Sequence, residues 1–318
     1  MADFLIGDIG GTNARLALAC RNTLAIRCAK TFGSQDFPSF RQVIETYLAE
    51  LPAGELIPEH ACFAVASPIT GDMVHFTNNP WSFSISELAR NLPFRDLKVI
   101  NDFVAVAMSL PHLSADHLLA MGTGALDPSL TLGVLGPGTG LGMALLLDVE
   151  GRKIPMPTEG GHAAWCPSDE YEMELWKVLR QGREIVSRED LLSGQGLVNL
   201  ANAVRCVDGW VDEGVVRAEE ITRLAIGEAN SQYIKVLDYF CAILGATAGD
   251  FALQTGARGG IFIAGGIIPR FREFFMGSRF REKFEAKGRF YDYVHEIPSV
   301  LITAGQPGLI GAAAALQN

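Results

Sequence analysis

Asn101 and Asp102 stand side by side in the largely apolar stretch LKVINDFVAVAM, residues 97–108. A carboxylate can accept the proton of a hydroxyl group, and an amide can hold a neighbouring hydroxyl by a hydrogen bond. The residues before the pair read as a buried strand, and open α/β sheets bind ligands at the carboxyl ends of their strands. An Asn-Asp pair is also a common helix N-cap, here for FVAVAMSL, and both uses can hold together.

A second polar group lies in PTEGGHAAWCP, residues 157–167, where Glu159 and His162 flank two glycines. A single His is more often structural, and Glu-Gly-Gly-His is too short for a zinc-binding helix motif, so a metal site is not predicted here. Together with Asn101 and Asp102, however, these side chains could donate to and accept from several hydroxyl groups. That is the requirement of a sugar.

Three glycine-rich segments could bind phosphate: residues 7–13 (GDIGGTN), residues 136–142 (GPGTGLG) and Gly265-Gly266. Successive backbone amides in such turns form concave anion sites, although tight turns between strands are the simpler reading of any one of them. The chain has no Gly-Lys dipeptide, which excludes a P-loop. The first two loops lack G-x-G-x-x-G and precede strand-like runs, which argues against a Rossmann site. Asp8 would repel phosphate unless it serves a cation, so it suggests Mg²⁺ held through water.

The elements around these loops alternate between strands and helices, which predicts an α/β layered sheet. The first loop is followed by a strand in which Ala14, Leu16 and Leu18 alternate with Arg15 and Ala17. Residues 37–51 have helical spacing of apolar residues, and the helix in SISELARNL should begin at Ser84 or Ser86. Similar readings predict a long apolar helix within residues 230–256, a buried strand in GGIFIAGGIIP and a final strand, turn and helix.

The strand, glycine-rich turn and strand of the N-terminus return near residue 132 in LGVLGPGTGLGMALLLDV. At an offset of 127 residues, Gly11-Thr12 aligns with Gly138-Thr139 and Ala17-Leu18 with Ala144-Leu145. This pattern indicates an internal duplication, and a chance likeness of two glycine-rich hairpins is the alternative. Leu135 stands where Asp8 stands in the first copy, so only the first loop could hold metal.

The composition favours a small soluble ligand over a polymer. The 318 residues carry a net charge of −10 and are 48% hydrophobic, enough for two domains, and no Lys/Arg-rich run suggests nucleic acid or an anionic membrane. Six cysteines without a C-x-x-C pair predict mostly buried thiols in a reducing compartment. The N-terminus lacks the basic segment of a signal peptide, and two prolines and five glycines break the longest uncharged run, residues 128–147. A cytoplasmic location is expected.

Seven ordered motifs over residues 4–316 resemble the bacterial glucokinase family of the hexokinase/actin-like ATPase superfamily: LIGDIGGTNARLALA, SPITGD, VINDFVAVAM, GPGTGLGMALL, EGGHAAW, SREDLLSGQGLVNL and GGIFIAGGIIPRF. The resemblance implies an α/β, two-domain actin-like ATPase (ribonuclease H-like) fold with an active-site cleft between a smaller and a larger domain. We expect the small domain to comprise residues 1–110 and 301–318 and the large domain residues 111–300. The Cys-rich zinc motif of the related ROK branch is missing, so structural zinc is not implied.

The resemblance also implies roles for individual residues. Its glucose ligands match Asn101, Asp102, Glu159, His162 and Glu189, with Asp102 as the catalytic base, for which an ordinary Asp pKa would suffice. The nucleotide ATP is expected at Asp8, Ile9, Gly10, Gly11, Thr12, Asn13, Gly138, Thr139 and Gly140, with its adenosine near Gly265 and Gly266. Mg²⁺ is expected at Asp8 through water. Pro137 has no amide hydrogen, so it is given no phosphate contact.

The activity implied is ATP-dependent phosphorylation of D-glucose at its 6-hydroxyl, giving glucose 6-phosphate and ADP and feeding glycolysis. Alternatives are a kinase for another hexose, a catalytically weak sugar-sensing regulator, and a polymerising actin-like ATPase. Because the first strand is expected to begin near residue 4, we expect no DNA-binding helix-turn-helix before it, and the net negative charge does not favour DNA binding. A filament has no use for sugar-binding side chains. Glucose and nucleotide are the expected partners, and the resemblance leaves a homodimer open.

Overall fold

The computed structural model describes residues 3–76, 81–211 and 217–317. The chain divides into two compact units, which are described separately. Unit 1 comprises Met1–Ala115, Leu146–Pro157 and Ala304–Asn318, and unit 2 comprises Asp116–Leu145 and Thr158–Thr303. The domain boundaries expected from sequence stay a prediction.

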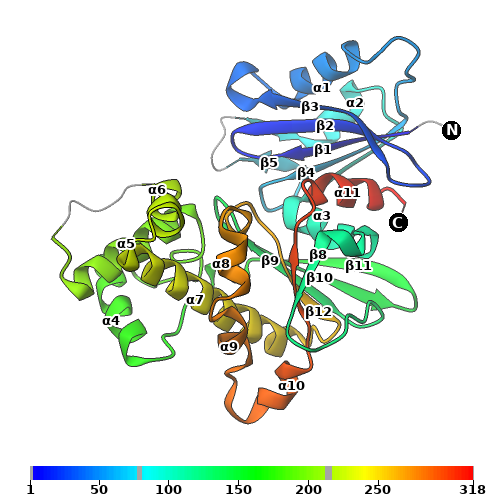
Figure 1. The fold of residues 1–318 in the computed structure, drawn as a ribbon. Coiled ribbons are helices and arrows are strands. Elements are labelled where there is room, and N and C mark those ends of the chain that lie inside the picture. Colours follow the sequence, from blue (N-terminus) through cyan, green and yellow to red (C-terminus); the bar gives the residue numbers. More distant parts are fainter. Residues whose placement is uncertain (1–2, 77–80, 212–216, 318) are drawn as a thin grey trace. The chain divides into compact units, whose positions relative to one another are not determined.

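Unit 1 is built on a five-stranded sheet with the order β3-β2-β1-β4-β7 (Figure 1). Its strands are β1 (Phe4–Ile9), β2 (Asn13–Ala19), β3 (Ile26–Gly33), β4 (His60–Val65) and β7 (Asp96–Asn101). The first three form antiparallel pairs, whereas β1, β4 and β7 run parallel. The carboxyl ends of β1, β4 and β7 therefore meet at one edge of the sheet, which brings Asp8 and Asn101 to the same edge.

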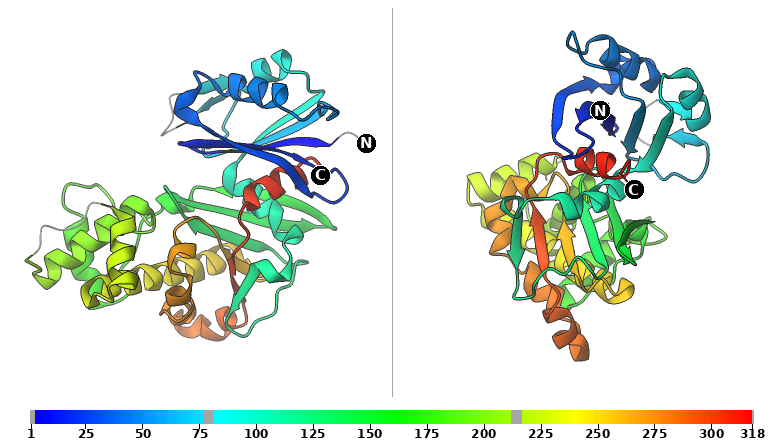
Figure 2. Two further views of the ribbon diagram at one scale, coloured as in Figure 1. Left: turned by 45° about the horizontal axis from the view of Figure 1, so that its top comes forward. Right: turned by 90° about the vertical axis from the view of Figure 1, so that its right-hand side faces the viewer.

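Helices cover both faces of this sheet (Figures 1 and 2). One face carries α1 (Phe40–Ala49) and α2 (Ile85–Asn91), and the other carries α3 (Asp102–Ser109) and α11 (Pro307–Ala314). The predicted alternation in β2 is therefore wrong at Ala17, which is fully buried like its neighbours Leu16 and Leu18. Arg15 alone of that pattern is exposed. A strand covered on both faces buries successive residues instead of every second one.

The helix starts of unit 1 follow capping chemistry that the sequence displays. Ser84, one of the two predicted caps, accepts the Glu87 N–H at 3.0 Å and begins α2. Ser39 does the same for α1 through the Gln42 N–H at 3.3 Å. A small two-stranded sheet, β5 (Met73–His75) with β6 (Ser82–Ser84), completes the unit. Local sequence therefore fixed these boundaries.

A second sheet has the order β11-β10-β9-β12-β13-β8. Its strands are β8 (Leu118–Met121), β9 (Leu132–Pro137), β10 (Leu141–Val149), β11 (Arg152–Thr158), β12 (Gly260–Ile263) and β13 (Ser299–Ile302). Strands β9, β12 and β13 run parallel. Strands β9, β10 and β11 begin at residues 132, 141 and 152, and β1, β2 and β3 at residues 4, 13 and 26, so the offsets are 128, 128 and 126. The two sheets thus repeat one strand order, as an internal duplication predicts.

The helices of unit 2 are α4 (Glu170–Leu179), α5 (Gly194–Asp208), α6 (Ala218–Thr222), α7 (Ser231–Thr255), α8 (Arg272–Met276), α9 (Phe280–Glu285) and α10 (Tyr291–His295). Helix α7 packs against α5 and α9 (Figure 2). Among the described helices it alone is long and apolar enough to cross a bilayer, but 72% of its most apolar window is buried inside the protein. We therefore read it as the core helix of unit 2.

All six cysteines are free thiols, but the expectation that most are buried is wrong. Only Cys62 and Cys241 are buried, and burial raises the pKa of both thiols to about 12. Cys166 and Cys206 are exposed. The former lies in a loop and the latter on the outer side of α5, positions where side-chain packing does not select for apolar residues.

Candidate active site

Asn101 ends β7 and caps α3. Its Oδ1 accepts the N–H groups of Phe103 at 2.9 Å and Val104 at 3.2 Å, and its Nδ2 donates to the Ser67 carbonyl at 3.3 Å and to Asp102 Oδ1 at 2.9 Å. The predicted cap is confirmed. All four hydrogen-bonding positions of this amide are engaged inside unit 1, so a sugar hydroxyl would have to share one of them.

Asp102 is the first residue of α3, and its carboxylate is held by the fold through one oxygen. Oδ1 accepts the Phe103 N–H at 2.9 Å and the Asn101 amide, while Oδ2 accepts from no other described residue. Burial, with a smaller contribution from the nearby Asp8 carboxylate, raises the pKa of Asp102 to about 6, and the hydrogen bond from the Phe103 N–H opposes that shift. The group is therefore a stronger base than an ordinary aspartate.

Asp8 lies in β1 directly opposite Arg15 in β2. The Arg15 guanidinium is 3.7 Å from Asp8 Oδ2, and the side chains are 45% and 29% exposed, so the pair is partly solvated. Burial raises the pKa of Asp8 and Arg15 opposes the shift. Gly308 approaches from α11, where a Cβ would stand 3.3 Å from Asp8 Cγ. Asp8 is thus closely packed against Gly308 and forms a partly solvated ion pair with Arg15.

Asp8 and Asp102 could supply only some of the ligands that a Mg²⁺ ion needs. Among the described residues no group of three or more His, Cys, Asp or Glu side chains could hold a metal ion. Mg²⁺ prefers oxygen ligands, keeps several waters and is commonly bound by one or two carboxylates together with substrate phosphates. A single half-buried carboxylate at Asp8, with the charge of Asp102 close by, fits that mode of binding.

Each glycine-rich turn presents two unengaged backbone amides. The Gly10 N–H closes the first turn on the Asn13 carbonyl at 2.9 Å, and the Gly138 N–H closes the second on the Gly140 carbonyl at 2.8 Å. The amides that follow, of Gly11 and Thr12 and of Thr139 and Gly140, donate to no acceptor in the described chain. Neighbouring free N–H groups of this kind can bind phosphate oxygens.

Glu159 and His162 lie in unit 2 at the two ends of a short turn after β11. His162 Nε2 is 3.9 Å from Glu159 Oε2, and the side chains are 63% and 60% exposed. The His162 N–H donates to the Glu159 carbonyl at 3.0 Å. Both side chains therefore have polar atoms open to a ligand.

Glu189 lies in a loop of unit 2 that contacts the Glu159–His162 turn and the start of β10. Its Oε2 accepts the Leu141 N–H at 2.7 Å, directly after the second glycine-rich turn, and its own N–H donates to the Gly161 carbonyl at 2.9 Å. Unit 2 thus connects the loop of Glu159, the loop of Glu189 and the Gly138–Gly140 turn. The sequence offered no signal for this connection, because Glu189 and Leu141 are 48 residues apart.

Gly265 and Gly266 differ in how closely the surrounding chain packs against them. Gly265 has φ +87°, and a Cβ there would stand 2.3 Å from the Pro137 carbonyl oxygen, so glycine is required for the end of β12 to approach the end of β9. Gly266 is exposed, with nothing within 4 Å of a Cβ position. Gly266 rather than Gly265 has free space for a ligand.

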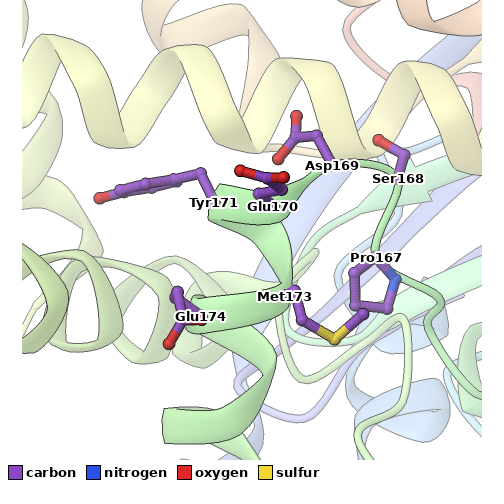
Figure 3. A pocket seen from close by; sticks show the side chains of 7 residues that line it. All are labelled: Pro167, Ser168, Asp169, Glu170, Tyr171, Met173 and Glu174. Atoms are coloured by element: carbon purple, nitrogen blue, oxygen red, sulfur yellow. The ribbon is translucent and has the colours of Figure 1, made fainter.

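An open pocket of about 800 Å³ lies elsewhere in unit 2, at the start of α4 (Figure 3). None of the predicted site residues lines it. Its walls are Pro167, Ser168, Asp169, Glu170, Tyr171, Met173 and Glu174. Three carboxylates and no cation among these residues make it a poor place for nucleotide phosphates.

The predicted residues therefore form one group in each unit. Unit 1 contains residues 8–13 together with Asn101 and Asp102, and unit 2 contains the Gly138–Gly140 turn together with Glu159, His162, Glu189, Gly265 and Gly266. Sequence reasoning did not select Arg15, although pairing across a hairpin with a three-residue turn would have set it opposite Asp8.

Comparison with known proteins identifies the family. The Glucokinase family profile matches residues 5–318. The glucokinase of Yersinia enterocolitica is 45% identical over 314 residues, 99% of this chain and 96% of its own. A crystal structure of glucokinase from an Antarctic psychrotroph aligns with a TM-score of 0.90 and 38% identity, covering 100% of this chain and 99% of that one. A ROK family glucokinase from Streptomyces griseus shares the fold, with a TM-score of 0.67, 16% identity and full coverage of both chains. With a profile match and a 45% identical relative that both span nearly its whole length, the chain belongs to the glucokinase family.

Proposed function

We propose that the protein transfers the γ-phosphoryl group of ATP to the 6-hydroxyl of D-glucose, with Asp102 as the base. The observation that carries the assignment of the base is the Asp102 carboxylate, which directly follows β7, is held through Oδ1 and has a pKa raised by burial. The names of the curated relatives favour this activity over the regulator and filament alternatives.

In the proposed reaction the 6-hydroxyl oxygen forms a bond to the γ-phosphorus of ATP as the bond from that phosphorus to the β,γ-bridging oxygen breaks, releasing ADP. Asp102 accepts the hydroxyl proton, and because the transition state is loose, its main task is to orient the nucleophile. Asn101 holds Asp102 in place. The sugar hydroxyls would be bound by the carboxylates of Glu159 and Glu189 and by His162.

The free amides of Gly11, Thr12, Thr139 and Gly140 are our candidates for the phosphate contacts, with the adenosine near Gly266. Asp8 would hold Mg²⁺ through water, and the bound ion would neutralise phosphate charge. The S. griseus enzyme, which shares the fold, was solved with glucose and AMPPNP. A cytoplasmic location and a homodimer remain expectations.

The direct test is a coupled ADP-release assay of the purified protein with ATP and Mg²⁺ against a panel of hexoses. We expect ADP formation that depends on sugar and is fastest, judged by kcat/KM, with glucose. Equal rates with and without sugar would contradict the proposal, and a clear preference for another hexose would replace glucose as the substrate.

The reaction should slow in mild acid, because the Asp102 base becomes protonated. Because the pKa of Asp102 is about 6, kcat/KM for glucose should fall roughly tenfold per pH unit below that value, as the carboxylate becomes protonated and can no longer accept the proton. An ordinary aspartate would keep the rate level to about pH 4. A pH–rate profile at constant ionic strength distinguishes the two, and a level profile down to about pH 5 would contradict the raised pKa.

A further inference from the structure

The Glu189 carboxylate packs directly against the second glycine-rich turn. Besides the 2.7 Å hydrogen bond from the Leu141 N–H to Oε2, a Cβ at Gly140 would stand 2.4 Å from that same oxygen. Only glycine at position 140 leaves room for the carboxylate. Oε1, by contrast, accepts no hydrogen bond in the described part of the chain.

The loop that carries Glu189 is itself anchored at several points. The Gly194 N–H donates to the Gly138 carbonyl at 2.8 Å, on the same turn. Ser193 caps α5 by accepting the Gly196 N–H at 2.9 Å, and its hydroxyl donates back to the Glu189 carbonyl at 2.9 Å. A side chain held on such a support can fix the position of what it touches, because little freedom is left to either partner.

We propose that Glu189 is a positioning residue for the nucleotide: its Oε2 holds the turn at Gly138–Gly140 in the conformation that binds phosphate. This rests on the proposed function, in which that turn binds ATP and Glu189 also binds sugar. One oxygen serves the turn and the other is left for a sugar hydroxyl.

A consequence is coupling between the two substrates within unit 2. A sugar that engages Oε1 restrains the Glu189 side chain and thereby the turn, so glucose should tighten nucleotide binding and nucleotide should tighten glucose binding by the same factor. A residue that bound sugar alone would leave nucleotide affinity unchanged in the absence of sugar. That difference separates the proposal from an exclusive sugar role.

The test is calorimetric binding of Mg·ADP, without sugar, to the full-length protein and four variants. Glu189→Ala removes the carboxylate, and Glu189→Asp keeps the charge but shortens the side chain by one methylene, so both lose the bond to Leu141. Glu189→Gln keeps an oxygen acceptor at full length. Glu159→Ala is the matched control, because the Glu159 carboxylate is also a proposed sugar ligand but makes no bond to the glycine-rich turn.

We expect the Ala and Asp variants to bind Mg·ADP about tenfold more weakly, the effect of losing one charge-assisted hydrogen bond that holds a loop. The Gln variant and Glu159→Ala should stay within about threefold of the wild type. Wild-type affinity in both Glu189→Ala and Glu189→Asp would overturn the proposal, as would an equal loss in Glu159→Ala or no rescue by Gln. Because the readout needs no sugar and no turnover, a failed glucose assay would count against the proposed function and not against this inference.

Discussion

Asp102→Asn should lower kcat by about 10²- to 10⁴-fold while glucose binding is largely kept, the usual contribution of a general base. Asparagine preserves the size of the side chain and one acceptor oxygen, so the hydrogen bond from the Phe103 N–H can persist. What is lost is the group that takes the proton. Steady-state rates with calorimetric titration of glucose measure both parts of the expectation, and near-normal kcat would remove Asp102 from the mechanism.

The same substitution should stabilise the protein at neutral pH. Burial raises the pKa of Asp102 from 3.8 to about 6, so its contribution to stability is fully present below the unfolded pKa of 3.8 and is lost as pH rises through about 6. The ionised carboxylate therefore costs stability at pH 7. Because Asp102 keeps partial contact with solvent, which screens this effect, we expect a gain of about 1 to 2 kcal/mol in the free energy of unfolding for Asp102→Asn, vanishing near pH 4.

Asp72→Asn is the matched control, because it makes the same change in the same unit at a carboxylate with the opposite shift. Hydrogen bonds from the Ser84 hydroxyl and then the Ser86 N–H lower the pKa of Asp72. Its neutralisation should reduce stability at neutral pH and leave kcat nearly unchanged. Denaturant unfolding at pH 7 and near pH 4 tests both variants, and a loss of stability in Asp102→Asn at pH 7 would contradict the expectation.

Gly311→Ala should destabilise unit 1 by about 3 kcal/mol, the upper part of the range for an overpacked core. A Cβ at Gly311 would stand 1.6 Å from the carbonyl oxygen of Ala105, so α11 and α3 would have to move apart. The better helix propensity of alanine offsets only about 1 kcal/mol of that cost. Because α3 begins at Asp102, kcat should fall as well.

Gly305→Ala provides the comparison in the same C-terminal segment. A Cβ at Gly305 would have nothing within 4 Å, and the residue is exposed, so its replacement should change stability by less than about 1 kcal/mol. Denaturant unfolding and steady-state rates measured on both variants give the comparison. Equal stability of the two variants would show that the helices accommodate the methyl group.

The sequence by itself determined the local parts of this protein. The hairpin around Gly10 and Gly11, the caps at Ser84 and Asn101, and the long helix α7 all follow from residue type and spacing, because turn geometry and capping bonds involve residues only a few positions apart. The seven motifs, in their order along the chain, were enough to identify the family. The candidate residues could likewise be named from their motifs, and their roles remain proposals.

Only the tertiary structure decided how distant segments meet. The bond of Glu189 to the Leu141 N–H, the contact of Gly311 with Ala105 and the burial of Ala17 depend on helices and loops that the spacing of nearby residues does not place. The raised pKa of Asp102 also depends on the tertiary structure, because the desolvation of a carboxylate is set by everything packed around it and not only by its neighbours in sequence. Periodicity tells which face of an element is apolar, but what covers that face, and at what distance, is a property of the whole fold.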